Sequence, residues 1–300
     1  MDPLYMKQLP TRTDGSDYNL ENHLAVLHDL FNGKIHSPEA AAKLASVALA
    51  LDASSLEAQL GQLWHLILRI ACENPEHQDK LVDLLVDMSY LPDATRPVED
   101  GVPVDEPLAL YDKRVWKDLP LLGWEIRRHW DTSIPPPGTD TKTPEERNVA
   151  ISRTVNVNRF VALLVATDEP VFLANSWFAL VTLRTALETP WAHMRMDEPL
   201  EAWIPAAAAW IEVLGAEMYE WDEEEESGYL AGARGSGGPL WNGKRGFSKE
   251  RWRFWRERFG EMAGKEDESE GVRRIAGEAG VMMEEIEGGG CSVDTLPPIY

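Results

Sequence analysis

The fold is decided by residues 143–188, which read TPEERNVAISRTVNVNRFVALLVATDEPVFLANSWFALVTLRTALE. Thr143-Pro144 followed by two acidic residues is typical of a helix start, because threonine can cap the first turn and proline is tolerated there. Apolar residues then recur at helical spacing up to the break at Thr167–Pro170, and again from Val171 to Glu188. The stretch therefore predicts two consecutive helices that fold back on each other around the break.

Two polar side chains stand out in this predicted hairpin. On a helical wheel, Arg184 falls among the apolar residues of its helix, and Asn158 does the same on the preceding one. Their axial positions would differ by about 7 Å, most of which an extended arginine can span. A buried arginine is costly unless it is paired and hydrogen-bonded. One interpretation is a structural Arg184–Glu188 ion pair with Asn158 bridging backbone groups; the other is an anion or carbonyl site in an apolar, tryptophan-lined cavity.

Helical patterns continue outward from this hairpin through most of the chain. Serines that can cap a helix precede apolar periodicity at Ser37 and Ser248, and Pro205 is expected to kink the helix that contains it. The expected helices cover about 37–51, 56–71, 75–89, 118–130, 143–166, 171–188, 200–222, 248–263 and a last segment ending near 287. No segment alternates long enough to predict a strand. We expect an all-α fold of about ten helices in an irregular multi-helix bundle.

The domain organisation follows from composition. Residues 1–18 are polar and are expected to form a flexible arm, and residues 19–287 a single helical domain. The Pro-rich connector 91–107 is either a subdomain boundary or a long surface loop. Five acidic residues and then many glycines in 222–247 predict a mobile loop, either a lid or disordered, and 288–300 is expected to be a disordered tail.

Charge and composition exclude several classes of protein. The chain has 29 basic and 51 acidic residues and a net charge of -22, so nucleic acid and anionic membranes are not expected as partners. An apolar fraction of 44% with 12 tryptophans is too high for a disordered chain. Neither an N-terminal signal core nor an uncharged apolar span is recognisable. The two distant cysteines suggest no disulfide framework. A cytoplasmic protein is expected, with the nucleus as the open alternative.

Two longer motifs carry a resemblance. They are W-x-x-L-P-x-L-G at 116–123 and the more specific G-G-P-L-W-x-G-x-x-G-F-S at 237–248. Shorter blocks accompany them at 63–64, 79–81, 156–160, 183–188 and 206–211. In these blocks, within about Leu56 to Glu287, the chain resembles a fungal protein family of uncharacterised function. The resemblance implies a fungal source and a helical domain, and it supplies no reaction and no catalytic residues.

Metal and cofactor motifs are missing from the sequence. The seven histidines never lie three or four residues apart, and with two distant cysteines no metal site and no cofactor are expected. Asp79, Asp83 and Asp87 follow one helical face, with Glu76 close by. They could form a carboxylate stripe for Mg²⁺, but a solvated face is the preferred interpretation because Mg²⁺ needs convergent oxygen ligands.

The C-terminal third contains the one basic segment. Lys244–Arg258 holds seven basic residues and two acidic ones, which suggests either phosphate recognition or neutralisation by the Asp222–Glu226 run and the rest of the acidic chain. Neutralisation is preferred. The glycines of the Gly237–Trp252 block are expected to let the backbone pack tightly under Trp241, rather than to form a lid over a pocket.

Two functions compete. The first is binding of a small apolar metabolite with an anionic or carbonyl group in a tryptophan-lined pocket. Whether the metabolite is also transformed, and by which catalytic residues, stays open. Its candidate ligand-binding residues are Arg184, Asn158, Arg127, Glu188, Trp64, Trp177, Trp210 and Trp241. The second is a protein-interaction scaffold or regulator without catalytic activity, with a partner surface at Arg253, Phe254 and Arg256. A homodimer is compatible with either.

Overall fold

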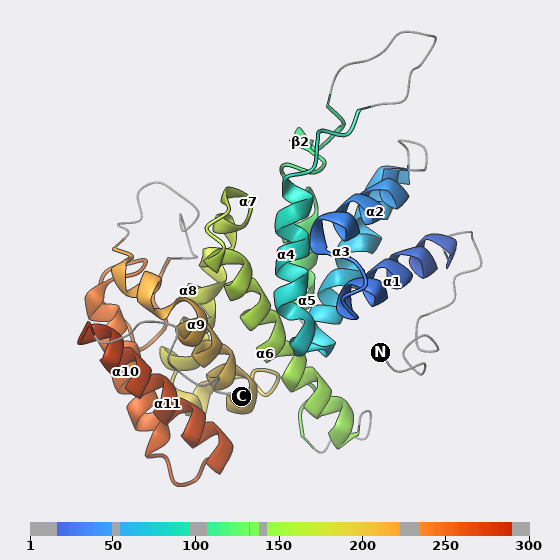
Figure 1. The fold of residues 1–300 in the computed structure, drawn as a ribbon. Helices are drawn as coiled ribbons and strands as arrows, with labels where there is room; N and C mark the ends of the chain where they lie inside the picture. The colour runs from blue at the N-terminus through green and yellow to red at the C-terminus, as the bar shows by residue number, and fades with distance from the viewer. Residues whose placement is uncertain are drawn as a thin grey trace, which may run out of the picture. The chain divides into compact units, whose positions relative to one another are not determined.

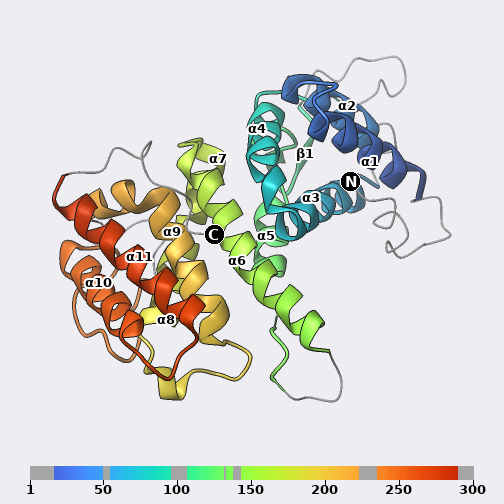
Figure 2. The same ribbon diagram turned by 60° about the horizontal axis from the view of Figure 1, so that its bottom comes forward.

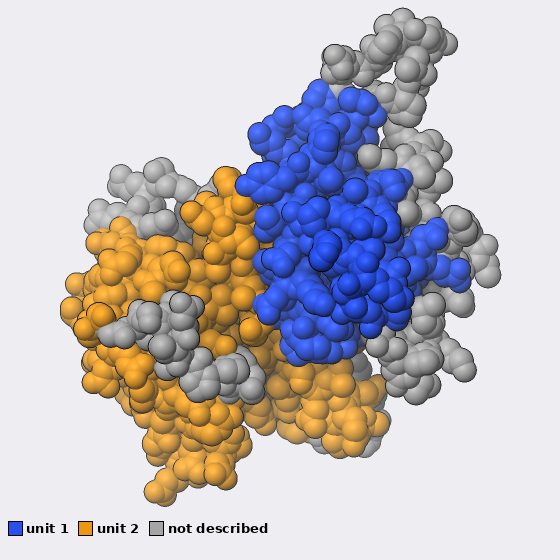
Figure 3. Space-filling view, in the orientation of Figure 1, with its two compact units in different colours: residues 1–125 blue, residues 126–300 orange. Residues whose placement is uncertain are grey.

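The computed structural model of the chain is mainly helical, which confirms the expected fold class (Figure 1). It describes residues 17–49, 55–95, 107–131, 133–137, 143–222 and 235–289. The chain divides into two compact units, unit 1 from 1 to 125 and unit 2 from 126 to 300 (Figure 3). Most of the predicted arm, nearly all of the predicted tail and residues 223–234 of the predicted loop lie outside the described residues.

Unit 1 is built from short helices and one small hairpin. Its elements are α1 (Asp17–Phe31), α2 (Ser37–Leu49), α3 (Leu56–Glu73), the 3-10 turn η3 (Pro75–His77), α4 (Gln78–Ser89), β1 (Ala109–Leu110) and β2 (Lys113–Arg114). Helix α2 packs on α1, α3 and α4, around buried side chains such as Leu27, Leu60 and Leu84. Asp79 and Asp83 are exposed on α4, as the solvated-face interpretation predicts.

The segment between β1 and α5 (Leu122–Trp130) corrects the sequence-based prediction. We expected no strands and a helix from about Asp118. Instead, β1 and β2 form an antiparallel hairpin of two residues each, too short to be recognised as an alternating pattern. Leu119 and Leu121 have left-handed backbones (φ 41° and 70°), which delays the start of α5 to Leu122. Asp118 accepts a hydrogen bond from the backbone N–H of Arg114 (2.7 Å).

Unit 2 holds the longer helices, with α9 at its centre. Its elements are the end of α5, α6 (Pro144–Ala166), α7 (Pro170–Leu173), η4 (Ala174–Ser176), α8 (Trp177–Leu187), η5 (Trp191–His193), α9 (Leu200–Glu220), α10 (Lys249–Ala263) and α11 (Glu270–Glu287). Helix α9 packs against α6, α8 and α11, and α10 lies beside α11 in both ribbon views (Figures 1 and 2). Predicted caps are confirmed: Thr143 forms a capping box with Glu146, and Ser248 caps α10.

The deciding stretch 143–188 folds back as predicted, since α6 packs against α8. Its second half is less regular than expected, because η4 separates α7 from α8. By length and composition alone, Pro144–Ala166 and Pro170–Leu187 could each cross a membrane. This is weak support for a membrane span, since core helices of folded proteins have the same composition. About half of the apolar 18-residue window in each segment is buried within the structure (44% and 50%).

Candidate functional site

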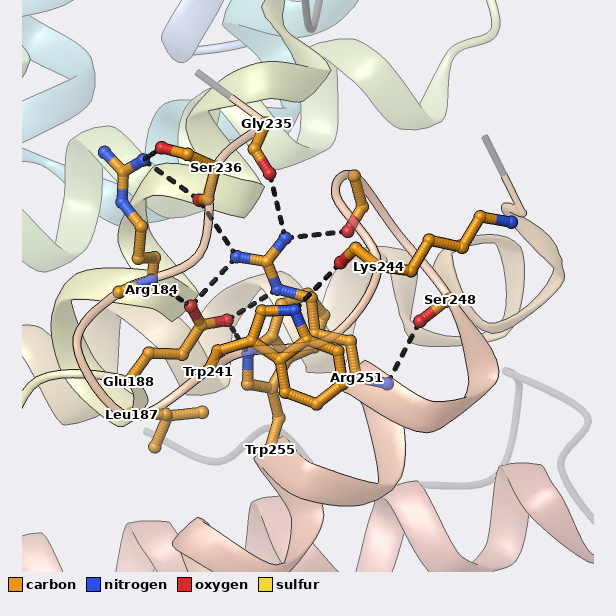
Figure 4. Close-up of polar contacts among 12 residues, drawn as sticks. Arg184, Leu187, Glu188, Gly235, Ser236, Trp241, Lys244, Ser248, Arg251 and Trp255 are labelled. Atoms are coloured by element: carbon orange, nitrogen blue, oxygen red, sulfur yellow. Dashed lines mark hydrogen bonds and ion pairs between the residues drawn. The ribbon is translucent and has the colours of Figure 1, made fainter. Parts of the chain in front are cut away.

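A fully buried ion pair joins the end of α8 to the start of α10 (Figure 4). Arg251 donates from Nε to Glu188 Oε1 (2.6 Å) and from Nη2 to Glu188 Oε2 (2.9 Å). Ser248 caps α10 by accepting a hydrogen bond from the backbone N–H of Arg251 (3.2 Å), which fixes the first turn of that helix. The two-point contact matches the planar fork of a guanidinium to a carboxylate.

Every N–H of the Arg251 guanidinium is used. Nη1 donates to the carbonyls of Gly235 (3.2 Å) and Gly246 (2.8 Å), and Nη2 also donates to the carbonyl of Ser236 (3.2 Å). Glu188 accepts two further bonds, from Trp255 Nε1 to Oε1 (2.7 Å) and from the Gly238 N–H to Oε2 (2.6 Å). A buried ion pair is tolerated when its remaining donors and acceptors are satisfied in this way. We call these residues, with Ser236, the Glu188–Arg251 network.

The glycines of this segment allow the backbone to reach the network. A Cβ at Gly238 would lie 2.7 Å from the Cβ of Glu188 and 2.9 Å from its carbonyl oxygen. A Cβ at Gly243 would collide with the ring of Trp241. The Leu240 N–H also donates to the Glu188 carbonyl (2.9 Å). From residue 235 onward, these contacts favour the expected tight packing over a lid.

Arg184 lies at the edge of the network and is half-buried. Its Nη1 donates to the carbonyl oxygen (3.2 Å) and to the hydroxyl oxygen (3.3 Å) of Ser236. Burial lowers the pKa of Arg184, while the Glu188 carboxylate raises it and Arg251 lowers it further. Arg184 thus interacts electrostatically with Glu188, as one interpretation expected, but the two-point hydrogen-bonded contact of the Glu188 carboxylate is made by Arg251.

Asn158 is the centre of a second buried network. Its Oδ1 accepts bonds from Thr182 Oγ1 (2.7 Å), Trp210 Nε1 (2.9 Å) and Trp130 Nε1 (3.2 Å). Its Nδ2 donates to the backbone carbonyl of Thr154 (2.8 Å). The side chain therefore ties together α5, α6, α8 and α9, mostly through other side chains rather than through the backbone groups we expected.

An aromatic cluster extends from this network toward the surface. It consists of Trp130, Trp177, Phe178 and Trp203, and we call it the Trp130 cluster. Trp130 meets Trp203 edge to face (centroids 5.5 Å, 83°) and Trp177 stacks on Phe178 (3.8 Å, 26°). The guanidinium carbon of Arg127 lies 5.3 Å from the Trp130 ring centre and 5.2 Å from that of Trp177. Half of the Arg127 side chain is exposed, so the cluster has one charged, solvent-facing edge.

Trp203 is the unusual member of this cluster. It is only 6% exposed, and its buried indole N–H has no acceptor among the residues that the structure describes. A buried donor without an acceptor is rare, because it loses its bonds to water without replacing them. The neighbouring indole of Trp130, in contrast, is bonded to Asn158.

A family model described as "Protein of unknown function (DUF3632)" matches residues 64–259. The chain belongs to this family. The expected membership of an uncharacterised family is thereby confirmed, whereas the fungal source stays a prediction. No curated protein and no solved structure matches the chain. The matched part of the DUF3632 chain includes both buried networks and the Trp130 cluster.

The structure distributes the eight predicted ligand-binding residues over three places. Trp64 belongs to unit 1, where it is buried and donates from Nε1 to the Pro120 carbonyl (2.8 Å). The Glu188–Arg251 network and its edge hold Glu188, Arg184 and Trp241, while the Asn158 network and the Trp130 cluster hold Asn158, Trp210, Trp177 and Arg127. Sequence reasoning missed Arg251 and Trp255 in the first group, and Trp130, Phe178 and Trp203 in the second.

The basic segment Lys244–Arg258 of this DUF3632 chain is largely neutralised by acidic neighbours, which agrees with the interpretation preferred from the sequence. The ion pairs are Lys244–Asp222 (2.7 Å), Lys249–Glu220 (3.0 Å), Arg256–Glu287 (3.0 Å) and Arg258–Glu261, in addition to Arg251–Glu188. Of the predicted partner surface, Arg253 is exposed, and the half-buried Phe254 tilts against Trp241 (5.5 Å). A partner at this surface stays a prediction.

Proposed function

We propose that unit 2 binds a small apolar molecule carrying an anionic group, at the Arg127 edge of the Trp130 cluster. No catalytic step is assigned. One observation carries the proposal: the exposed Arg127 guanidinium lies over Trp130 and Trp177, while the adjoining Trp203 holds a buried N–H without an acceptor among the described residues. The proposed site therefore combines a cation, aromatic ring faces and a hydrogen-bond donor without an acceptor.

The chemistry of the ligand follows from these three groups. A guanidinium pairs with carboxylate, sulfonate or phosphate oxygens in a two-point geometry. Indole rings bind apolar and aromatic groups through their faces. An acceptor atom of the ligand would form a hydrogen bond with the Trp203 N–H. A buried donor without an acceptor destabilises the folded protein by about 1–3 kcal/mol. The Arg127–Asp131 ion pair is exposed, and such pairs contribute little, so Arg127 can move aside at small cost.

The polar groups of the two buried networks are less suited to this task. Arg251 already makes five hydrogen bonds and Asn158 makes four. A ligand that recruited either group would first have to break bonds that hold helices together. We therefore give the orienting role, first expected of Arg184, Asn158 and Arg127 together, to Arg127 alone.

The test uses anilinonaphthalene sulfonate, an aromatic anion, as the probe, and the neutral N-phenylnaphthylamine as its matched partner. We expect the folded protein to bind one molecule of the sulfonate probe per chain, in a saturable manner. Arg127→Gln should weaken it about tenfold, the value of one charge-assisted contact. Trp203→Phe, which removes the N–H together with the five-membered ring of the indole, should weaken it several-fold.

The neutral probe and Arg128→Gln serve as controls. Arg128 is exposed and adjacent to Arg127 in α5. Binding of the neutral probe should not change in Arg127→Gln, and binding of the sulfonate should not change in Arg128→Gln. Absence of saturable sulfonate binding, or an equal loss in both arginine variants, would reject the proposed site. The interaction-scaffold hypothesis would then be the remaining one.

A further inference from the structure

Two large aromatic side chains of unit 1 are in contact with each other and exposed to solvent. Trp124, near the start of α5, is 69% exposed, and Tyr111, at the tip of the β1–β2 hairpin, is 55% exposed. Their ring centres lie 5.8 Å apart and the rings are tilted by 36°. Aromatic side chains dominate binding energy at protein interfaces, and an exposed adjoining pair is the kind of surface on which partners dock.

The backbone that presents this pair is strained. Tyr111 and Asp112 form the two-residue turn of the hairpin with φ of 55° and 60°, a conformation that normally selects asparagine and glycine. Between this turn and Trp124, Leu119 and Leu121 are also left-handed. Four of the five non-glycine residues with positive φ in the described parts of the chain thus fall in 111–121. Strained backbone persists where the surrounding structure imposes it, and it clusters at functional sites.

Buried neighbours hold the strained segment in place. Val115, Trp116 and Leu119 are almost completely buried, and the Trp64 indole donates to the Pro120 carbonyl (2.8 Å). The core of unit 1 thus fixes the segment from below, while Tyr111 and Trp124 remain in solvent. The two rings are therefore already ordered in the free protein. A partner would not have to order them, so the entropy cost of binding is smaller.

Charged side chains of both signs lie near the Tyr111 and Trp124 rings, and the Glu57 carboxylate contacts Tyr111. The Tyr111 hydroxyl donates to Glu57 Oε1 (2.8 Å), and this bond raises the pKa of Tyr111. Asp112, beside Tyr111 in the turn, is exposed, and so is Lys113, which follows it. Over the whole chain the net charge is -22, which favours a cationic partner.

We propose that Tyr111, Trp124 and Glu57 form a docking platform for an arginine side chain of a basic peptide segment. The planar guanidinium stacks on the two rings and pairs with the Glu57 carboxylate. Arginine fits this arrangement better than lysine, because its charge is delocalised over a flat group that stacks on aromatic faces and is more weakly hydrated. This platform is a protein-interaction surface, separate in unit and in ligand from the small-molecule site proposed for unit 2.

The experiment compares hexa-arginine with hexa-lysine, each labelled with fluorescein, by fluorescence anisotropy with the full chain at physiological ionic strength. Hexa-arginine should bind more tightly than hexa-lysine. Trp124→Ala should weaken hexa-arginine binding about fivefold, as expected for one exposed cation–π contact, and leave hexa-lysine almost unchanged. Trp124→Phe, which keeps a ring, should recover part of the loss, and Glu57→Gln should weaken hexa-arginine as well.

Tyr90→Ala is the matched control, because Tyr90 is an equally exposed aromatic residue of unit 1 (68%). It should leave both peptides unaffected, and so should Arg127→Gln, which disables the site proposed for unit 2. Equal binding of the two peptides, unaltered by Trp124→Ala, would show that net charge alone attracts them and would overturn the platform. So would an absence of hexa-arginine binding, or a fivefold loss in Tyr90→Ala equal to that in Trp124→Ala.

Discussion

Replacement of Arg251 by methionine is expected to destabilise unit 2 far more than the same change at Arg184. In Arg251→Met, the fully buried Glu188 carboxylate keeps only its bonds from the Trp255 and Gly238 N–H groups. Three backbone carbonyls, those of residues 235, 236 and 246, lose a donor. Removal of one partner from a buried ion pair costs about 3–5 kcal/mol, because the other charge is left uncompensated.

Arg184→Met is the matched comparison. It removes two contacts to Ser236, one to the same carbonyl that Arg251 reaches, from a side chain that is only half-buried. We expect a loss of about 1 kcal/mol, the net value of an ordinary hydrogen bond. The contrast between the two variants should therefore be at least about 2 kcal/mol, which is a large part of the total stability of a typical domain.

The assay is urea unfolding, followed by far-UV circular dichroism and by tryptophan fluorescence. Arg251→Lys keeps the positive charge but loses the two-point hydrogen bonding of the guanidinium. Its free energy of unfolding should lie between those of the wild type and Arg251→Met, and it replaces Arg251→Met in the comparison if that variant does not fold. Glu188→Gln combined with Arg251→Met should lose less than the sum of the two single changes, because no charge is left unpaired. Additive losses, or an Arg251→Met variant as stable as Arg184→Met, would refute the reasoning.

Three further predictions concern the rest of the interior. Asn158→Leu leaves two indole N–H groups and one hydroxyl without their buried acceptor and should cost about 3 kcal/mol in urea unfolding; a loss below about 1 kcal/mol would contradict its central role. Gly238→Ala should lower stability by about 1–3 kcal/mol, because the new Cβ would collide with Glu188. Gly260→Ala, which has open space around it in α10, should raise stability by about 0.5–1 kcal/mol. Equal effects of the two changes would argue against the close approach of Gly238 to Glu188. Burial lowers the pKa of His23 to about 4, from 6.5, so the unfolded chain takes up the proton first as pH falls. Stability present above pH 6.5 should thus decline by about 3 kcal/mol toward pH 4, and His23→Phe should remove most of that decline.

Helix starts could be predicted from the sequence because they depend on nearby residues. The capping box joins Thr143 and Glu146, and the Ser248 side chain caps the backbone N–H three residues further on; both contacts are present. The start of α5 could not be predicted in the same way. Leu119 and Leu121 adopt left-handed backbones that leucine disfavours, and the burial of their neighbours, rather than local preference, holds them there.

The candidate site was predictable only in part, because its contacts join distant segments. The helical wheel correctly marked Arg184 and Asn158 as polar groups on apolar faces, but it carried no information about their partners. Arg251 lies 63 residues beyond Glu188 and was counted only as one of the seven basic residues of Lys244–Arg258. A local pattern existed nonetheless: Arg251 is one helical turn before Trp255, on the buried face of α10. The helical wheel of α10 thus places Arg251 on the buried face of that helix.

The buried polar residues that stabilise this protein and the exposed side chains that we expect to bind are different ones. Arg251, Glu188 and Asn158 have their bonding capacity filled by the chain itself, so their substitution should lower stability. Tyr111 and Trp124 are exposed, and Arg127 is half-exposed, so their substitution should change stability by less than about 0.5 kcal/mol, as at most surface positions. The two classes of variant therefore separate fold from function. If Trp124→Ala or Arg127→Gln lowered stability as much as Asn158→Leu, these side chains would be parts of the scaffold, and the binding roles assigned to them would fail together with that separation.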